Sequence, residues 1–250
     1  MVIKNPYLPL LTEAERDIRA AKVLLNEQLY PRAAFSFQQA VEKASKFWGV
    51  SQNWITIDEI KKIGHKSDKI FRYIFTRGGA EPEATKEYDK FFCIVKQLPN
   101  MDERVDFIWR ELEAQRRTTF IPVRDNESYF DAFVRFYNEN PDAKTVKGTL
   151  YGYYLKWKDM PNREEMMKDF IIGSNTFFKA PQYLMLLSFL VIDTEQNTRY
   201  PDITANTTTD KLYNESTRYI QRMPLLLPFF QLFCKRLRKY FSKVKDSTAS

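Results

Sequence analysis

A single histidine limits the catalytic chemistry available to this chain. His65 is the only histidine in 250 residues, so a Ser–His–Asp triad, a Cys–His pair or a histidine-rich metal site would have to include it. It follows Gly64 at a predicted helix start, where its imidazole can bond free backbone N–H groups. We interpret it first as a structural residue and second as a ligand contact. No Gly-rich phosphate loop, serine-hydrolase motif or zinc-protease motif is present, so no catalytic residue, metal ligand or cofactor is expected.

Polar side chains gather at three- and four-residue spacing on the predicted second helix. They are Gln38, Gln39, Glu42, Lys43 and Lys46. Residues at this spacing share one face of a helix, so Glu42 can pair with Lys46. A solvated surface explains this face simply. The alternative is one wall of a ligand pocket, in which Lys43 contacts an anion together with an arginine from a later loop.

That later loop carries Arg199, Tyr200, Pro201 and Asp202 in succession. In an architectural role Arg199 would bond helix-end carbonyls, Tyr200 would close one end of a bundle, and Pro201 would set the turn. The alternative is a ligand site shared with the earlier candidates. Its members would be Lys43, His65, Arg199, Tyr200 and Asp202.

The segment from Lys144 to Lys158 interleaves lysines with large aromatic side chains. Lysines can meet phosphates while aromatic rings stack on bases, which is typical of single-stranded nucleic-acid binding. Partial burial of the rings explains the same composition equally well. The candidate nucleic-acid contacts are Lys144, Lys147, Tyr151, Lys156, Trp157 and Lys158.

Further cations cluster near the C-terminus. They are Lys235, Arg236, Arg238, Lys239, Lys243 and Lys245. We interpret them as the polar side of an amphipathic helix, where they favour the negative end of the helix dipole and require no partner.

Composition indicates a helical protein with a basic surface. The net charge of +7 permits contact with nucleic acid, nucleotides or acidic proteins, and a lysine-rich solvated surface explains it as well. Only 7 glycines occur, which disfavours a fold built on tight β-turns. Cys93 and Cys234 lie in apolar helical stretches without metal-binding spacing, so both are expected to be reduced and buried. With no apolar leader and no bilayer-length apolar run, we expect a cytoplasmic protein without a membrane segment.

The first two predicted helices would position most of the polar candidates. Thr12 and Glu15 form a Thr-x-x-Glu capping box, which predicts a helix that ends near Tyr30. Pro31 suits the first turn of a second helix that ends at Gly49. The short connection makes the helices antiparallel with their apolar stripes facing. These stripes are Leu11, Ala14, Ile18, Ala21 and Leu25, then Ala33, Phe37, Ala40, Ala44 and Phe47.

Further helices follow with the same periodicity. A second capping box, Thr56 with Glu59, predicts a short helix that Gly64 ends. Asp102 is predicted to cap another helix, and Pro181 to begin a later one. Helical stripes are also predicted around Ile70, Tyr88, Val105 and Phe133, and from Leu212 to Val244 with a kink at Pro224.

Three stretches of the chain occur in an order typical of one protein family. Residues 14–49 combine an early helix, a tyrosine and an A-x-x-x-Q-Q-A-x-E-K-x-x-K helix. Residues 64–68 are similar to the Gly/Thr-His-Asp-Leu that opens a third helix in that family. Residues 198–202 contain an Arg-Tyr-Pro that many members carry before their final helix. In these stretches the chain resembles the HEPN family (higher eukaryotes and prokaryotes nucleotide-binding).

The resemblance implies an all-α fold: a HEPN-like up-and-down helical bundle with an additional, mostly helical insertion. It places a HEPN-like core at about residues 8–77 and 180–241, and the insertion at about 80–179, within a single domain, 1–250. Family members are often dimeric. They occur beside nucleotidyltransferases, in toxin–antitoxin and defence systems, and as nucleotide- or RNA-associated modules.

Some family members are metal-independent ribonucleases, marked by an arginine, a polar residue, a short spacer and a histidine. Before His65, positions 58 to 60 hold Asp, Glu and Ile, so the motif is absent. The resemblance therefore implies a noncatalytic protein that binds a nucleotide or RNA in a toxin–antitoxin, defence or stress-response system, with a partner such as a nucleotidyltransferase and as a homodimer. Two alternatives stay open: a protein-interaction module acting through the aromatic-rich insertion, and an atypical HEPN ribonuclease.

Overall fold

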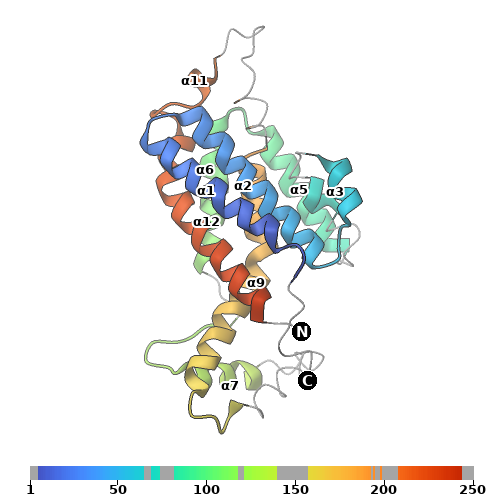
Figure 1. Ribbon diagram of the computed structural model, residues 1–250, viewed down its shortest axis with the longest axis vertical. Helices are drawn as coiled ribbons and strands as arrows, with labels where there is room; N and C mark the ends of the chain where they lie inside the picture. The colour runs from blue at the N-terminus through green and yellow to red at the C-terminus, as the bar shows by residue number, and fades with distance from the viewer. Residues whose placement is uncertain are drawn as a thin grey trace. The chain divides into compact units, whose positions relative to one another are not determined.

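The computed structural model describes residues 5–64, 69–73, 82–117, 121–139, 157–192, 194, 198 and 208–243. Within these ranges the regular elements are helices and no strand occurs (Figure 1), which confirms the predicted all-α class. The helices are α1 (Leu8–Asn26), α2 (Tyr30–Ser51), α3 (Ile57–Ile63), α5 (Pro82–Gln97), α6 (Met101–Arg117), α7 (Tyr129–Glu139), α9 (Arg163–Leu190), α11 (Thr209–Leu212) and α12 (Arg218–Lys243).

The chain divides into two compact units. The first comprises Met1–Gln115 and Ala180–Ser250, and the second comprises Arg116–Lys179. Helix α9 therefore contributes its first part to the second unit and its last part to the first. Helices α5 and most of α6, which were assigned to an insertion, belong to the first unit. The single domain with an insertion at residues 80–179 stays a prediction.

The first unit is built on the hairpin of α1 and α2. Figure 1 shows the two helices side by side, and α12 packs along α1. Both predicted apolar stripes are buried except for Leu25, which is partly exposed. Helix α1 ends at Asn26, and Gln28 then adopts a positive φ of 59°, which turns the chain back. Pro31 lies in the first turn of α2 as predicted.

The predicted start of the first helix is wrong. Helix α1 begins at Leu8, with Pro9 in its first turn, where the fixed φ of proline suits a helix and its missing N–H costs nothing. Thr12 therefore lies one turn inside, and its hydroxyl donates to the carbonyl of Leu8. Glu15 does not complete a capping box, because its carboxylate accepts hydrogen bonds from Arg238.

Gly49 does not end α2, which continues to Ser51. Its role is close packing: a Cβ at position 49 would lie 2.5 Å from Cδ1 of Ile55, far inside van der Waals contact. Any larger residue here would displace the Ile55 side chain, because the segment after α2 folds back on the helix. The capping box of Thr56 and Glu59 is confirmed at the start of α3, and Gly64 ends that helix with a φ of 63°.

Helix α6 is capped by a different residue from the one predicted. Asn100 accepts the backbone N–H of Glu103 at 2.9 Å, whereas Asp102 lies in the first turn. The Asp102 carboxylate instead accepts the backbone N–H of Arg218 at 2.9 Å, at the start of α12. An acidic side chain at a helix N-terminus satisfies a donor that the helix itself leaves free. The predicted stripe of Val105, Ile108 and Leu112 is buried.

The beginning predicted for the later helix is also wrong. Helix α9 starts at Arg163 and carries Pro181 in its interior. Leu184 and Leu187 in its last part are buried, and so is Val191 directly after the helix. Of the two cysteines expected to be buried, Cys234 is buried and Cys93 is exposed, and both are free.

Aromatic rings fill much of the core of the first unit. Phe37 of α2 meets Phe230 of α12 edge to face, with ring centroids 5.8 Å apart. Phe189 of α9 lies 5.5 Å from Phe91 and 5.6 Å from Tyr88, both in α5. Such pairs add directional contacts to the apolar area they bury.

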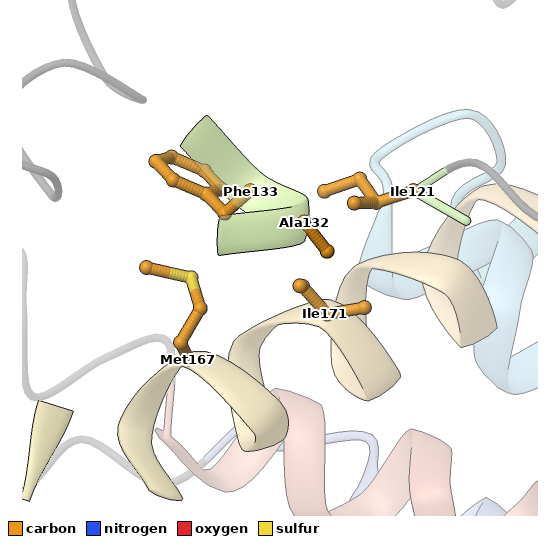
Figure 2. Close-up of a cluster of buried hydrophobic side chains, with 5 residues drawn as sticks. All are labelled: Ile121, Ala132, Phe133, Met167 and Ile171. Carbon is orange, nitrogen blue, oxygen red and sulfur yellow. The ribbon is translucent and has the colours of Figure 1, made fainter. Parts of the chain in front are cut away.

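The second unit has a small core of its own (Figure 2). Five buried side chains form it: Ile121, Ala132, Phe133, Met167 and Ile171. The helix predicted around Phe133 is confirmed as α7, which brings Phe133 to this core. Asn175 of α9 pairs with the backbone of Ile121, accepting its N–H at 2.8 Å and donating to its carbonyl at 3.2 Å. This pairing satisfies the backbone N–H and carbonyl of Ile121, which lies outside any helix and is buried.

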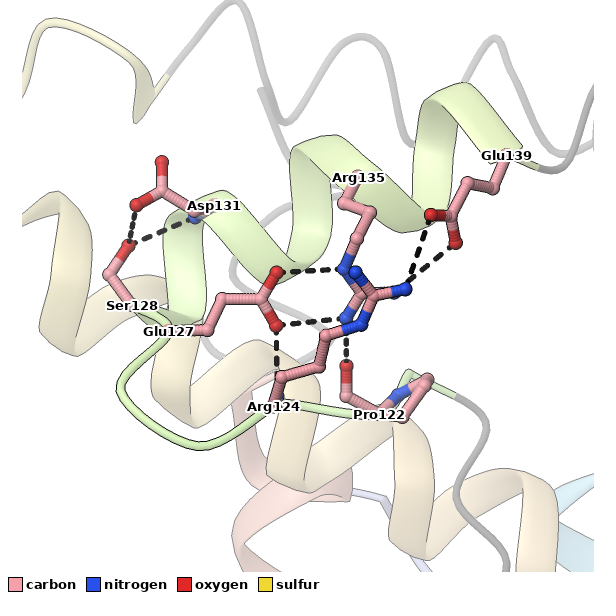
Figure 3. A network of polar contacts seen from close by, with 7 residues as sticks. All are labelled: Pro122, Arg124, Glu127, Ser128, Asp131, Arg135 and Glu139. Atoms are coloured by element: carbon pink, nitrogen blue, oxygen red, sulfur yellow. Dashed lines mark hydrogen bonds and ion pairs between the residues drawn. The ribbon is translucent and has the colours of Figure 1, made fainter.

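A polar network runs from the segment before α7 along the helix to its end (Figure 3). Arg135 donates to both carboxylate oxygens of Glu127, at 2.7 and 2.8 Å, and to the carbonyl of Pro122 at 2.7 Å. Arg124 donates its backbone N–H to Glu127 at 2.9 Å. The side-chain hydrogen bond from Arg135 and this backbone hydrogen bond hold the pKa of Glu127 at about 2, well below its ordinary 4.5.

This low pKa predicts acid sensitivity of the second unit. The pairing of Glu127 with Arg135 stabilises the fold fully above pH 4.5. This contribution disappears as the pH falls from 4.5 toward 2, because Glu127 is then protonated in the unfolded chain and still ionised in the folded chain. Urea unfolding across this pH range, wild type beside Glu127→Gln, measures it. The variant should be less stable at neutral pH and should lose less stability on acidification; identical pH profiles would contradict the prediction.

Candidate functional site

The polar face of α2 forms a hydrogen-bonded cluster, which we call the α2 network: Gln38, Gln39, Glu42, Lys43 and Lys46. The carboxylate of Glu42 pairs with the ammonium group of Lys46 and accepts hydrogen bonds from the amides of Gln38 at 3.2 Å and Gln39 at 3.5 Å. Gln39 also donates to the amide oxygen of Gln38 at 2.7 Å. Five neighbouring side chains are thus locked to one another or to α1.

Burial makes this network unusual for a helix surface. The Glu42 side chain is only 3% exposed and that of Lys46 12%, and Gln38 is buried as well. The interpretation as a solvated face is therefore wrong for these three residues. Taking an ion pair out of water costs more than the pair returns unless its hydrogen bonds are well satisfied. Here two amides and an ammonium group share one carboxylate, which meets that condition.

Lys43 joins α2 to α1. Its ammonium group donates to the carboxylate of Asp17, and both side chains are partly exposed. The predicted anion contact is therefore occupied by an internal carboxylate, which neutralises it. A ligand anion would have to displace Asp17 or add to the partly exposed edge of this pair.

Hydroxyl groups continue the polar character of α2 into the core. Ser45 lies 3.3 Å from Ser188 of α9, oxygen to oxygen, and both residues are fully buried. No cluster of histidine, cysteine and carboxylate side chains suited to a metal ion occurs among the described residues. The arrangement of α2 supports recognition by hydrogen bonds and charge, and the side chains in it supply no activated nucleophile.

Most other predicted site residues lie outside the described residues. These are His65, Arg199, Tyr200, Asp202, Lys144, Lys147, Tyr151 and Lys156. Two nucleic-acid candidates belong to the second unit. The ring of Trp157 meets Phe170 edge to face at 5.6 Å and packs against the small core, and Lys158 lies 4.0 Å from Asp159. Lys43 is the one predicted ligand-binding residue that lies within the described ranges.

The sequence-based candidates did not include Asp17. Its position was a usable signal for an ion pair with Lys43. Asp17 directly precedes the buried Ile18, so it lies at the edge of the apolar stripe of α1, next to the polar face of the antiparallel α2. Arg238 was placed with the cations that need no partner, yet it binds Glu15 through two nitrogens, at 2.9 and 3.1 Å, and Thr12 at 3.1 Å. That contact joins α12 to α1, two helices that lie near opposite ends of the sequence.

The fold and the α2 network define an all-helical protein whose opening hairpin carries a buried polar cluster. The family model of the HEPN domain matches residues 7–48, which contain α1 and most of α2. The predicted resemblance of the opening hairpin is thereby confirmed, and the α2 network lies inside the matched residues. No curated protein matches the chain, and no solved structure does. None of the helices in the described ranges combines the length and apolarity needed to cross a bilayer.

Proposed function

We propose that this chain is a noncatalytic HEPN-like binding protein whose ligand is a nucleotide or RNA, contacted at the exposed rim of the α2 network. The observation that carries the proposal is the coincidence of the HEPN match with a helix that keeps four polar side chains bonded together, two of them buried, beside a fifth, Lys43, that is bonded to α1. The proposal includes a partner protein such as a nucleotidyltransferase, and a setting in toxin–antitoxin, defence or stress-response systems.

The sequence supports the noncatalytic part of this proposal. The one histidine, His65, lacks an arginine at the spacing that marks the ribonucleases of the family. A general base at neutral pH would otherwise have to come from a side chain with a pKa moved toward 7. In the α2 network the carboxylate of Glu42 is committed to three donors.

The rim of the network offers one cation that a ligand can reach. Lys43 is partly exposed and is held by Asp17 alone among the ion pairs of the described residues. Gln39 lies one turn away on the same face, partly exposed, with amide groups that suit a base edge or a phosphate oxygen. A phosphate that bonds Lys43 would compete with the carboxylate of Asp17. Removing the charge of Lys43 should therefore weaken ligand binding, and removing the charge of Asp17 should strengthen it.

We expect Lys43→Gln to weaken nucleotide binding by about tenfold or more, because a hydrogen bond to a charged group contributes roughly 1.5–3 kcal/mol. Asp17→Asn should strengthen binding, because it frees the ammonium group of Lys43. Isothermal titration of the full chain with ATP, AMP and a short single-stranded RNA measures both effects. Lys22→Gln, on the exposed side of α1, is the matched control for loss of one positive charge.

Opposite shifts of the two variants, with the control unchanged, are the expected result. If Lys43→Gln and Asp17→Asn bind as the wild type does, the Lys43–Asp17 pair is only a tie between α1 and α2. If no nucleotide or RNA binds at low salt, the proposed function fails altogether. For RNA, affinity that does not fall with salt would exclude contact through phosphates.

A further inference from the structure

The long C-terminal helix α12 carries charge of one sign only. Its 26 residues include seven lysines and arginines and no aspartate or glutamate. Its inner side is buried in the first unit through large apolar residues: Tyr219, Met223, Leu226, Phe230, Phe233 and Leu237. A helix of this kind ordinarily shows a polar outer side.

The outer side of α12 is apolar in its middle. Leu225 is 54% exposed and Leu232 is 49% exposed. Pro224, directly before Leu225, and Pro228, between the two leucines, are exposed too. Positions 225, 228 and 232 follow at steps of three and four, so they lie on one stripe, on the side of the helix opposite to Met223 and Phe230. We call Leu225, Pro228 and Leu232 the outer stripe.

Cations bound this stripe at both ends. Arg218 lies before it, half-exposed and 3.6 Å from Asp106. Lys235 and Arg236 lie after it and are exposed, and neither forms an ion pair with another residue in the part of the chain that the structure describes. Arg238, by contrast, faces α1 and is paired. The outer stripe therefore leads into two exposed positive charges.

We propose that the outer stripe of α12 docks an acidic amphipathic helix of a partner protein. Apolar residues at three- and four-residue spacing match the seam along which two helices pack. The partner's apolar side would cover Leu225 and Leu232, and its carboxylates would meet Lys235 and Arg236. Complementary charge at the end of such a seam sets the orientation of the partner and excludes others.

The charge pattern excludes a second copy of α12 as the occupant. In a parallel pairing Lys235 and Arg236 would face themselves. In an antiparallel pairing centred on Pro228 they would face the positions of Gln221 and Ile220, which lie between Arg218 and Arg222. Because α12 contains no carboxylate, either arrangement places like charges together, which is unfavourable.

The test uses the full chain and a fluorescein-labelled synthetic peptide of about 20 residues, long enough to form a helix. The peptide carries leucines at three- and four-residue spacing and glutamates on the flanks. Its matched control has lysine in place of each glutamate. Fluorescence polarisation at low and high salt compares wild type with Leu225→Ser/Leu232→Ser and with Lys235→Gln/Arg236→Gln. Val23→Ser, an exposed valine on α1, is the control for loss of surface apolarity.

We expect the acidic peptide to bind and the basic peptide not to bind. Each α12 double variant should weaken binding by about tenfold or more, added salt should weaken it as well, and the Val23 variant should bind as the wild type. Unchanged melting temperatures would show that the variants fold. Equal binding of both peptides, or wild-type binding by both α12 variants, would overturn the proposal. Binding to phosphatidylserine vesicles through the same residues, without peptide binding, would overturn the proposed partner helix and identify an anionic membrane surface as the occupant of the outer stripe.

Discussion

Phe37→Ala should lower the free energy of unfolding of the first unit by about 3–5 kcal/mol. Phe37 of α2 is fully buried, and its ring meets Phe230 of α12 edge to face at 5.8 Å. Removing the ring forfeits the transfer free energy of the side chain and leaves a cavity that α1, α2 and α12 cannot close without moving together. Urea unfolding followed by circular dichroism measures the change.

The aromatic contact itself can be isolated by a double-mutant cycle. Phe37→Ala combined with Phe230→Ala should cost less than the sum of the single changes, with a coupling of about 0.5–1.5 kcal/mol. Val23→Ala, at an exposed site on α1, should change stability by less than about 0.5 kcal/mol. A loss below about 1 kcal/mol for Phe37→Ala would mean that Phe37 is not packed in the core of this unit.

Lys46→Met should be nearly as damaging, at about 3 kcal/mol. The substitution keeps the length and the apolar stem of the side chain but leaves the buried carboxylate of Glu42 without its ammonium partner. The figure lies at the lower end of the range for a broken buried pair, because the amides of Gln38 and Gln39 still donate to Glu42. Thermal and urea unfolding of the variant beside the wild type measure the loss.

Two comparisons show whether burial is the cause. Lys61→Met breaks a pair with Asp58, three residues earlier in α3, but both of those side chains are exposed, so its effect should stay below about 1 kcal/mol. Lys46→Met combined with Glu42→Leu removes both charges and should recover most of the lost stability. Equal losses for Lys46→Met and Lys61→Met would contradict the account of the α2 network as a buried pair.

The opening hairpin could be predicted from the sequence because its signals are local. The apolar stripes of α1 and α2 repeat at the period of a helix, and Pro31 marks the start of the second helix wherever the rest of the chain lies. The capping box at Thr56 was predicted for the same reason: a hydroxyl and a carboxylate three residues apart complete it without any other segment.

The same pattern failed at Thr12, because α1 begins one turn earlier, at Leu8, and because a tertiary contact takes the second residue of the pattern. Glu15 binds Arg238 of α12, a residue that lies more than two hundred positions later, so its carboxylate is not available to cap a helix. Asp102 is not the cap of α6, because Asn100 two positions earlier takes that place, and the Asp102 carboxylate serves the start of α12 instead. Local spacing shows that a bond can form, and distant partners decide whether it does.

The sequence by itself determined the helical class, the hairpin of α1 and α2, and the set of polar side chains that share one face of α2, because each depends on residues within a few turns of one another. Only the tertiary structure decided that Glu42 and Lys46 are buried while Leu225 and Leu232 are exposed. Periodicity reports which residues share a side of a helix, but the side that meets water depends on which other helices pack there. That choice is made by contacts between segments far apart in the chain, and those contacts make one face of α2 a buried polar network and leave one face of α12 uncovered in this chain.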